Sequence, residues 1–235
     1  MDEAPDNLRL RNALAQAYTA SQDFSSAEVE YVKILEIQSN ILNIWVKLAR
    51  LRAAQGDRDA ARGTIEEGLT AIPDAPDLLW GKAFYLESEG DIDGAIAIYE
   101  ALYERLSASP IIANNLASLL STHREDDDSL TRAKIISRRL KNTEIPAFQD
   151  TYGWILYRSG DINESIPYLE AAAEGLVNDP RVQYHLGAAY AAAGRTNEAQ
   201  AQLTRALATI DFLGDPDLEN TIRTQLDAIG GKSDP

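Results

Sequence analysis

Residues 180–213 read PRVQYHLGAAYAAAGRTNEAQAQLTRALATIDFL, and the fold can be worked out from this segment. Gly194 marks a turn between two apolar-rich halves, and small residues stand on either side of it, at Gly187 and Ala199. A left-handed turn at a glycine ends one helix and allows another to begin. The small residues stand where the two helices would cross, because a larger side chain would hold the backbones apart. The segment therefore predicts two antiparallel helices joined by a tight turn.

The same arrangement recurs about every 34 residues through most of the chain. Turn pairs stand at Gln22-Asp23, Gly56-Asp57, Gly90-Asp91, Gly160-Asp161 and Gly194-Arg195. A small residue precedes each turn, at Ala15, Ala49, Ala83, Ala117, Gly153 and Gly187, and another follows it, at Ala27, Ala61, Ala95, Ala133, Ser165 and Ala199. Four units open at a proline, where a helix tolerates the missing N–H: Pro76, Pro110, Pro146 and Pro180. One such unit cannot bury its apolar stripe alone, so the units must stack.

These phases predict six repeats, at 8–41, 42–75, 76–109, 110–145, 146–179 and 180–213, after an N-terminal tail over 1–7. In the fourth repeat we expect segment 121–128 to form a long, protruding acidic turn in which His123 is solvated. Asp215 and Pro216 predict the start of a capping helix within 214–230, before a disordered tail over 231–235. No equivalent cap precedes the first repeat. We expect either that the array is cut from a longer one or that its first helix packs on a partner.

This pattern resembles the tetratricopeptide-repeat (TPR) family over residues 8–213. The last unit carries the resemblance most fully, at Leu186, Gly187, Tyr190, Gly194, Ala199, Leu203 and Ala206. The resemblance implies an all-α, right-handed superhelical solenoid whose first helices line a concave groove. It also implies a scaffold that binds a peptide or a helix of a partner protein in that groove, and not an enzyme.

By resemblance, the motif positions that face the groove hold polar and aromatic residues. We expect partner binding at Asn12, Asn43, Arg50, Trp80, Phe84, Asn114, Trp154, Tyr157, Arg181 and Tyr184. The aromatic members would be at least partly exposed anchors for partner side chains, unless superhelical curvature buries them between neighbouring helices. The asparagines would bind a peptide backbone through their amides. The lysine and asparagine pairs by which some TPR domains clamp chaperone tails do not occur at these positions.

Composition removes several other function classes. The net charge of -15 disfavours nucleic acid and anionic membrane surfaces, and favours a basic or neutral protein partner unless it only keeps the chain soluble. The chain has no cysteine and no apolar run long enough to span a membrane. Its two histidines, His123 and His185, lack metal-site spacing, and no glycine-rich phosphate loop is present. We therefore expect no catalytic residue, metal or cofactor.

Three later segments narrow the resemblance. IIANNLASLL (111–120), DTYGWILYRSGD (150–161) and YHLGAAYAAAGRTNEAQ (184–200) are similar to repeats of bacterial TPR lipoproteins that accompany exopolysaccharide and exosortase-type sorting systems. This resemblance implies a bacterial scaffold in the periplasm or at the envelope, in preference to the cytoplasm. The alternative it implies is a non-catalytic segment of a larger envelope or polysaccharide-export or synthesis assembly protein. The oligomeric state stays open, although any dimer would use the uncapped first repeat.

Overall fold

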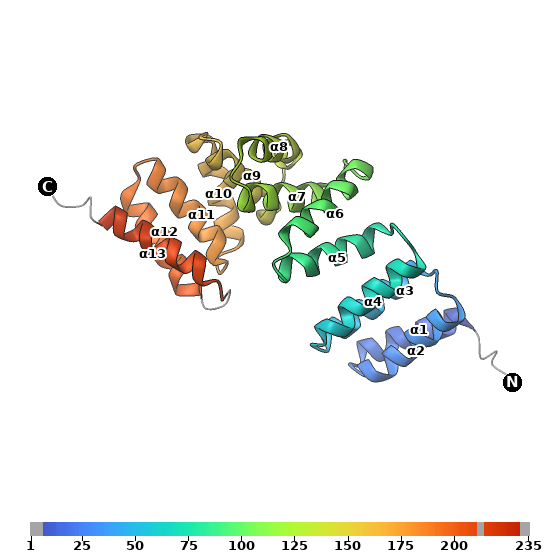
Figure 1. Ribbon diagram of the computed structural model, residues 1–235. Helices are drawn as coiled ribbons and strands as arrows, with labels where there is room; N and C mark the ends of the chain where they lie inside the picture. The colour runs from blue at the N-terminus through green and yellow to red at the C-terminus, as the bar shows by residue number, and fades with distance from the viewer. Residues whose placement is uncertain (1–6, 211–213, 231–235) are drawn as a thin grey trace. The chain divides into compact units, whose positions relative to one another are not determined.

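The chain is all-helical over residues 7–210 and 214–230, which are the residues that the computed structural model describes. Figure 1 shows the helices in chain order. They are α1 (Leu8–Ala20), α2 (Phe24–Ile37), α3 (Leu42–Ala54), α4 (Arg58–Ala71), α5 (Pro76–Ser88), α6 (Ile92–Arg105), α7 (Pro110–His123), α8 (Asp127–Ser137), the 3₁₀ turn η1 (Arg138–Leu140), α9 (Pro146–Arg158), α10 (Ile162–Gly175), α11 (Pro180–Ala192), α12 (Thr196–Thr209) and α13 (Pro216–Gly230). The expected tails over 1–7 and 231–235 lie outside the described residues except for Asn7.

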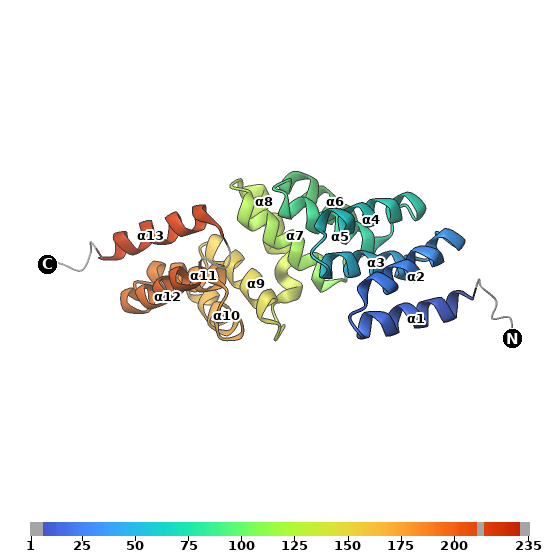
Figure 2. The same cartoon turned by 90° about the horizontal axis from the view of Figure 1, so that it is seen from below.

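The helices fall into two compact units, Met1–Glu104 and Arg105–Pro235. In the first unit α1 packs on α2, α2 on α3, α3 on α4 and α4 on α5. In the second unit α7 packs on α8, α9 on α10, α10 on α11 and α11 on α12. Within each unit these packed helices lie side by side (Figures 1 and 2). This succession of helix pairs is that of an α-solenoid.

The small residues lie at the helix crossings, as the sequence predicts. The predicted alanines are all buried, most of them completely, and Ser165 is fully buried as well. A Cβ added to Gly187 would stand 2.8 Å from the side chain of Leu203, and one added to Gly153 would stand 2.8 Å from Leu169. These distances are below van der Waals contact, so the two helices of a pair touch along a seam that admits no larger residue.

The turns and helix starts follow local chemistry. Gly56 and Gly160 both have φ of +83°, and Gln22 holds the equivalent position in the first repeat at φ +63°. The aspartates that follow three of the turns cap the next helix: each side chain accepts a backbone N–H three residues on, at Asp23, Asp57 and Asp91. Asp161 is an exception, because its carboxylate instead accepts from Lys134 Nζ at 2.6 Å.

The expected long turn of the fourth repeat is wrong, although His123 is exposed as expected. Ser121 and His123 belong to the last turn of α7, and α8 already begins at Asp127. Ser121 is buried, and its carbonyl accepts from Arg158 Nη1 of α9 at 2.6 Å. Asp126 caps α8 by accepting from Ser129 N at 2.8 Å. The extra residues therefore join the end of α7 and the start of α8 instead of an open loop, because helix termini that find capping partners are more stable than an open loop.

The predicted capping helix is present as α13. Asp215 accepts from the backbone N–H of Leu218 at 3.0 Å, and Pro216 is the first helical residue. Ile222 and Ile229 are buried in a core that they share with α10, α11 and α12, and Leu218 and Leu226 pack against it half-buried. Figure 2 shows α13 beside α11 and α12. The helix covers the apolar surface that α12 would otherwise expose.

Candidate functional site

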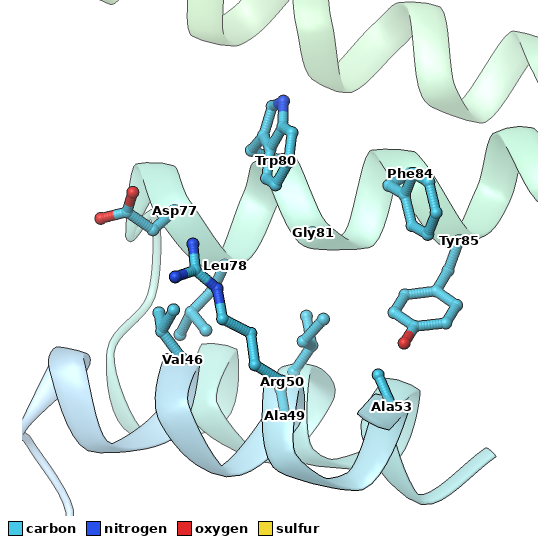
Figure 3. A pocket seen from close by; sticks show the side chains of 11 residues that line it. Val46, Ala49, Arg50, Ala53, Asp77, Leu78, Trp80, Gly81, Phe84 and Tyr85 are labelled. Carbon is cyan, nitrogen blue, oxygen red and sulfur yellow. The ribbon is translucent and has the colours of Figure 1, made fainter. Parts of the chain in front are cut away.

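An apolar pocket lies between α3 and α5 in the first unit. Its cavity has a volume of about 210 Å³ and its walls include Val46, Ala49, Ala53, Ile65 and Leu78, with Trp80, Phe84 and Tyr85 along α5. Figure 3 shows the α3 side chains facing those of α5 across the cavity. Trp80 is 39% exposed and Phe84 is 50% exposed. The pocket is therefore an open apolar recess with two aromatic side chains that reach solvent.

Two opposite charges stand at this pocket. Arg50 on α3 and Asp77 at the start of α5 both line it, and neither makes an ion pair with a described residue. Phe84 meets the buried Tyr85 edge to face, with ring centroids 5.6 Å apart, which holds the exposed ring in place. The arrangement can take an apolar side chain and pair with charged groups next to it.

A second, polar pocket lies among α7, α9 and α11 in the second unit. Its cavity has a volume of about 220 Å³ and is lined by residues that include Asn114, Ser118, Asp150, Trp154, Arg181 and His185. Two buried polar atoms on its walls, Asn114 Oδ1 and Trp154 Nε1, have no hydrogen-bond partner among the described residues. One is an acceptor and the other a donor, so the pocket offers complementary groups to an amide.

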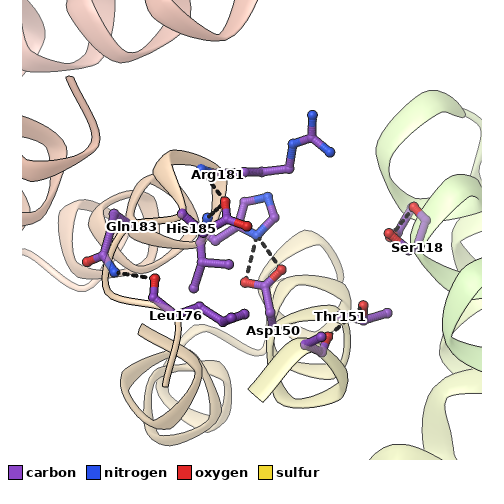
Figure 4. A network of polar contacts seen from close by, with 11 residues as sticks. Ser118, Asp150, Thr151, Leu176, Arg181, Gln183 and His185 are labelled. Carbon is purple, nitrogen blue, oxygen red and sulfur yellow. Dashed lines mark hydrogen bonds and ion pairs between the residues drawn. The ribbon is translucent and has the colours of Figure 1, made fainter. Parts of the chain in front are cut away.

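The wall of the polar pocket contains a buried histidine that is paired with a half-buried aspartate. His185 Nδ1 lies 2.9 Å and 3.1 Å from the two carboxylate oxygens of Asp150 (Figure 4). A carboxylate only accepts hydrogen bonds, so Nδ1 carries the proton. The imidazole also stacks on the Trp154 indole at 4.0 Å between centroids. The hydrogen bond and the stacking together fix the orientation of the ring in the pocket wall.

Trp154 is not the exposed anchor that the sequence predicts. The side chain is only 9% exposed, because His185 stacks on one side and Tyr157 stacks at 4.8 Å with a 17° interplanar angle. Tyr184 lies tilted against the same indole at 5.8 Å. Tyr157 and Tyr184 are half-buried, and burial raises the pKa of both phenols. Packing against the next repeat thus makes these three aromatics a structural cluster in which Tyr157 and Tyr184 keep partial exposure.

The other predicted site residues differ in their surroundings. Asn12 Oδ1 already accepts from Lys47 Nζ and from Gln16 Nε2, both at 3.1 Å. Asn43 is exposed and lines neither pocket. Arg181 is exposed at the polar pocket, 3.6 Å from a carboxylate oxygen of Asp215. The structure thus brings Arg50, Trp80 and Phe84 together in one pocket and Asn114, Trp154 and Arg181 in the other.

Sequence reasoning missed two features of these sites. The first is the Asp150–His185 pair; the separation of these residues by about one repeat was the signal that they stand on neighbouring first helices. The second is Asp77, which follows the proline that opens α5 and has no distinguishing pattern.

The described helices offer no sign of two other kinds of site. None of them is long and apolar enough to cross a membrane. Within residues 7–210 and 214–230, no three His, Cys, Asp or Glu side chains come close enough together to hold a metal ion.

Several solved structures have a fold similar to that of this chain. No curated protein matches the sequence. Among solved structures, a TPR protein from Parabacteroides merdae superposes with a TM-score of 0.65 at 12% identity, covering 94% of this chain and 98% of that one. YrrB, a TPR protein with an unusual peptide-binding site, gives 0.57 at 16% identity, covering 83% and 97%. A thermophilic TPR protein from Thermus thermophilus gives 0.56 at 22% identity, covering 79% and 99%.

At these low sequence identities the structural matches establish only the fold. The family is shown by a match between the sequence and a family model. The Tetratricopeptide repeat model matches residues 46–110 and 153–211, which together make up more than half of the chain. Both matched segments contain the turn glycines and the buried small residues described above. The chain belongs to the tetratricopeptide-repeat family.

Proposed function

We propose that this chain is a protein-interaction scaffold that binds a peptide or a helix of a partner protein at the apolar pocket between α3 and α5. The observation that carries the proposal is the pair of exposed aromatic side chains, Trp80 and Phe84, at the edge of a recess of about 210 Å³. Exposed aromatics beside a concave apolar pocket are the usual anchors of an interface. YrrB, which shares the fold, is described as having a peptide-binding site.

The partner side chain that fits this pocket is aliphatic or aromatic. Covering the exposed part of one such aromatic removes roughly 100 Å² from water, which stabilises a complex by roughly 2 kcal/mol. Arg50 and Asp77 can also pair with an acidic and a basic group next to that residue of the partner. Against the overall charge of -15, a partner segment of neutral or positive net charge associates fastest.

The polar pocket offers a further contact for a peptide. Asn114 Oδ1 accepts an N–H and Trp154 Nε1 donates to a carbonyl, and both atoms are buried and unpaired in the free chain. Leaving such groups unpaired costs about 1–3 kcal/mol each, which an amide from a bound partner would recover. The predicted role of Asn114 in holding a peptide backbone is kept here, and Trp154 acts through its indole N–H instead of as an exposed anchor.

The test is peptide selection followed by NMR. Peptides selected by display on the full chain are titrated while the indole N–H signals are followed. The chain has three tryptophans. Trp45 donates to Ser39 O at 2.6 Å and serves as an internal reference. We expect the Trp80 signal to move, and Trp80→Ala or Phe84→Ala to weaken binding about ten-fold or more.

A matched control separates this site from general surface binding. Ile135 on α8 is also a large apolar residue with an exposed side chain, and it lines neither pocket. Ile135→Ala should leave affinity unchanged. Selected peptides that move only the Trp154 signal would place binding at the polar pocket, and affinities equal in all variants would refute both assignments.

The envelope role remains part of this proposal. It rests on the resemblance of segments 111–120, 150–161 and 184–200 to lipoprotein repeats. We propose a scaffold within a larger periplasmic or envelope assembly. Fractionation of the source cells, with the chain detected by antibody, tests it: recovery in the cytoplasm alone would exclude this placement without touching the peptide pocket.

A further inference from the structure

The polar pocket among α7, α9 and α11 holds buried polar atoms that the described residues leave unpaired. Trp154 Nε1 is a donor without an acceptor, and its side chain is only 9% exposed. Asn114 Oδ1 is an acceptor without a donor, whereas the amide nitrogen of the same side chain donates to Asn115 Oδ1 at 3.3 Å. Buried polar atoms normally have hydrogen-bond partners, so an unpaired donor and an unpaired acceptor in one pocket wall indicate a missing ligand group.

A third group in this wall is the second ring nitrogen of His185. Nδ1 carries the proton that binds Asp150, so in the neutral ring Nε2 is an acceptor. Figure 4 shows this nitrogen on the side of the ring away from Asp150. It makes no hydrogen bond with a described residue. Because the bond to Asp150 and the stacking on Trp154 hold the ring in place, the acceptor has a fixed direction.

Most other polar groups of the wall already have partners. Thr151 Oγ1 donates to a backbone carbonyl of its own helix at 3.2 Å, and Asp179 accepts from two backbone N–H groups at the start of α11. Arg181 is exposed to water beside an aspartate. The hydroxyl group of Ser118 can rotate either to donate or to accept. The pocket therefore lacks one acceptor, for the indole, and two donors, for the amide and the imidazole.

The group that supplies one acceptor and two donors together is the primary amide of an asparagine or glutamine side chain. Its carbonyl oxygen can accept from the indole N–H, and its NH₂ group can donate to both acceptors. A carboxylate has no donor, and an ammonium or guanidinium group has no acceptor. A backbone amide has a single N–H, so it leaves one of the two acceptors unpaired.

We infer that the polar pocket is a recognition site for the primary amide of an asparagine or glutamine side chain in a bound peptide. The inference rests on the proposed peptide function, and it names the residue type that the second unit recognises. The cavity of about 220 Å³ far exceeds the roughly 10–15 Å³ that a single water molecule needs, so a side-chain amide has room inside.

The first test uses single-residue probes. N-acetyl-L-glutamine N-methylamide, or its asparagine analogue, is titrated into the isotope-labelled full chain while the indole N–H signals are followed by NMR. We expect a saturable shift of the Trp154 signal, with Trp45 as the internal reference. The glutamate, lysine and norleucine analogues share the same backbone amides and should bind about ten-fold more weakly or worse, because each lacks the carbonyl, the NH₂ group or both.

A pair of chain variants tests the named acceptor. Asn114→Leu keeps the approximate size of the side chain and removes Oδ1, so it should weaken the glutamine probe about ten-fold or more. Asn43→Leu is the matched control, because Asn43 is exposed and lines neither pocket. It should leave the affinity unchanged. Circular dichroism checks that both variants are folded, and the comparison of probes on the wild-type chain stands whether or not Asn114→Leu folds.

Peptides selected by display on the full chain give an independent readout. Those that move the Trp154 signal should contain asparagine or glutamine, and a change of that residue to the matching acid should weaken binding about ten-fold or more. A shift of the Trp80 signal reports the apolar pocket instead. Peptides that leave Trp80 unmoved would therefore count against the proposed function, whereas the single-residue probes test the polar pocket alone.

Three results would overturn the inference. The first is a glutamate or lysine probe that binds as tightly as the glutamine probe. The second is a Trp154 signal that neither the amide probes nor any selected peptide containing asparagine or glutamine can move. The third is free L-glutamine or L-asparagine that binds about ten-fold more tightly than its blocked form, which would make the ligand a free amino acid and not a side chain of a peptide.

Discussion

The turn at Gln22 offers a stability gain that the other repeats already have. Gln22 has φ +63°, whereas the equivalent position one repeat on is Gly56 at φ +83°. The left-handed region costs a non-glycine residue about 1–2 kcal/mol. Glycine avoids this cost but makes the unfolded chain more flexible, which lowers the gain in stability by about 0.4–1 kcal/mol. Gln22→Gly should therefore raise the free energy of unfolding by about 0.5–1 kcal/mol.

The converse change is Gly56→Ala, for which no atom lies within 4 Å of the added Cβ. The cost is then in the backbone alone, and we expect a loss of about 1 kcal/mol. Both sites lie in the first unit, so shifts of about 2–4 °C or more are expected in its melting temperature. Circular dichroism with heat and with urea measures them. Gln22→Ala, which keeps the strain, should show no gain.

A destabilising Gln22→Gly, or a neutral Gly56→Ala, would refute the argument. Either outcome would mean that side-chain contacts outweigh backbone strain at these turns, and that the repeats are not equivalent in the way their φ angles indicate.

Two further predictions concern buried polar contacts in the second unit. Burial and the hydrogen bond to Glu170 raise the pKa of Tyr190 to about 12, so this contact stabilises the fold below pH 10 and is lost as the pH rises toward 12. Tyr190→Phe should therefore reduce the fall of the urea unfolding midpoint between about pH 9 and 11.5. If the midpoint falls as steeply in the variant as in the wild type, this phenol is not the cause of the fall. Asp150→Ala leaves the Nδ1–H of buried His185 without an acceptor and should lower the free energy of unfolding by about 2 kcal/mol. Asp150→Asn keeps an acceptor and should lower it by less. If both variants lower the free energy of unfolding equally, the charge of Asp150 and not its hydrogen bond is responsible.

Local patterns in the sequence are enough to specify the repeat unit and its internal geometry. The spacing of turn glycines, aspartate caps and crossing alanines predicts the antiparallel pairs, because these features act within one helix pair and its turn. They bring residues into contact that are close in the chain. The capping helix is equally legible, since Asp215, Pro216 and the apolar stripe of α13 are local signals. The fourth repeat is the exception, because added residues can lengthen a helix as easily as a turn, and capping partners determine which occurs.

Which groove residues are open depends instead on packing between repeats. Trp80 and Trp154 are predicted alike as anchors, but the burial of each depends on side chains one repeat away. His185 stacks on Trp154 and leaves it 9% exposed, whereas Trp80 keeps 39%. The same holds for Leu10 and its equivalent Ile44, which stand at the same repeat position and have opposite exposure. The pattern of a repeat specifies its own fold, and the neighbour that packs against it determines which of its faces remain available.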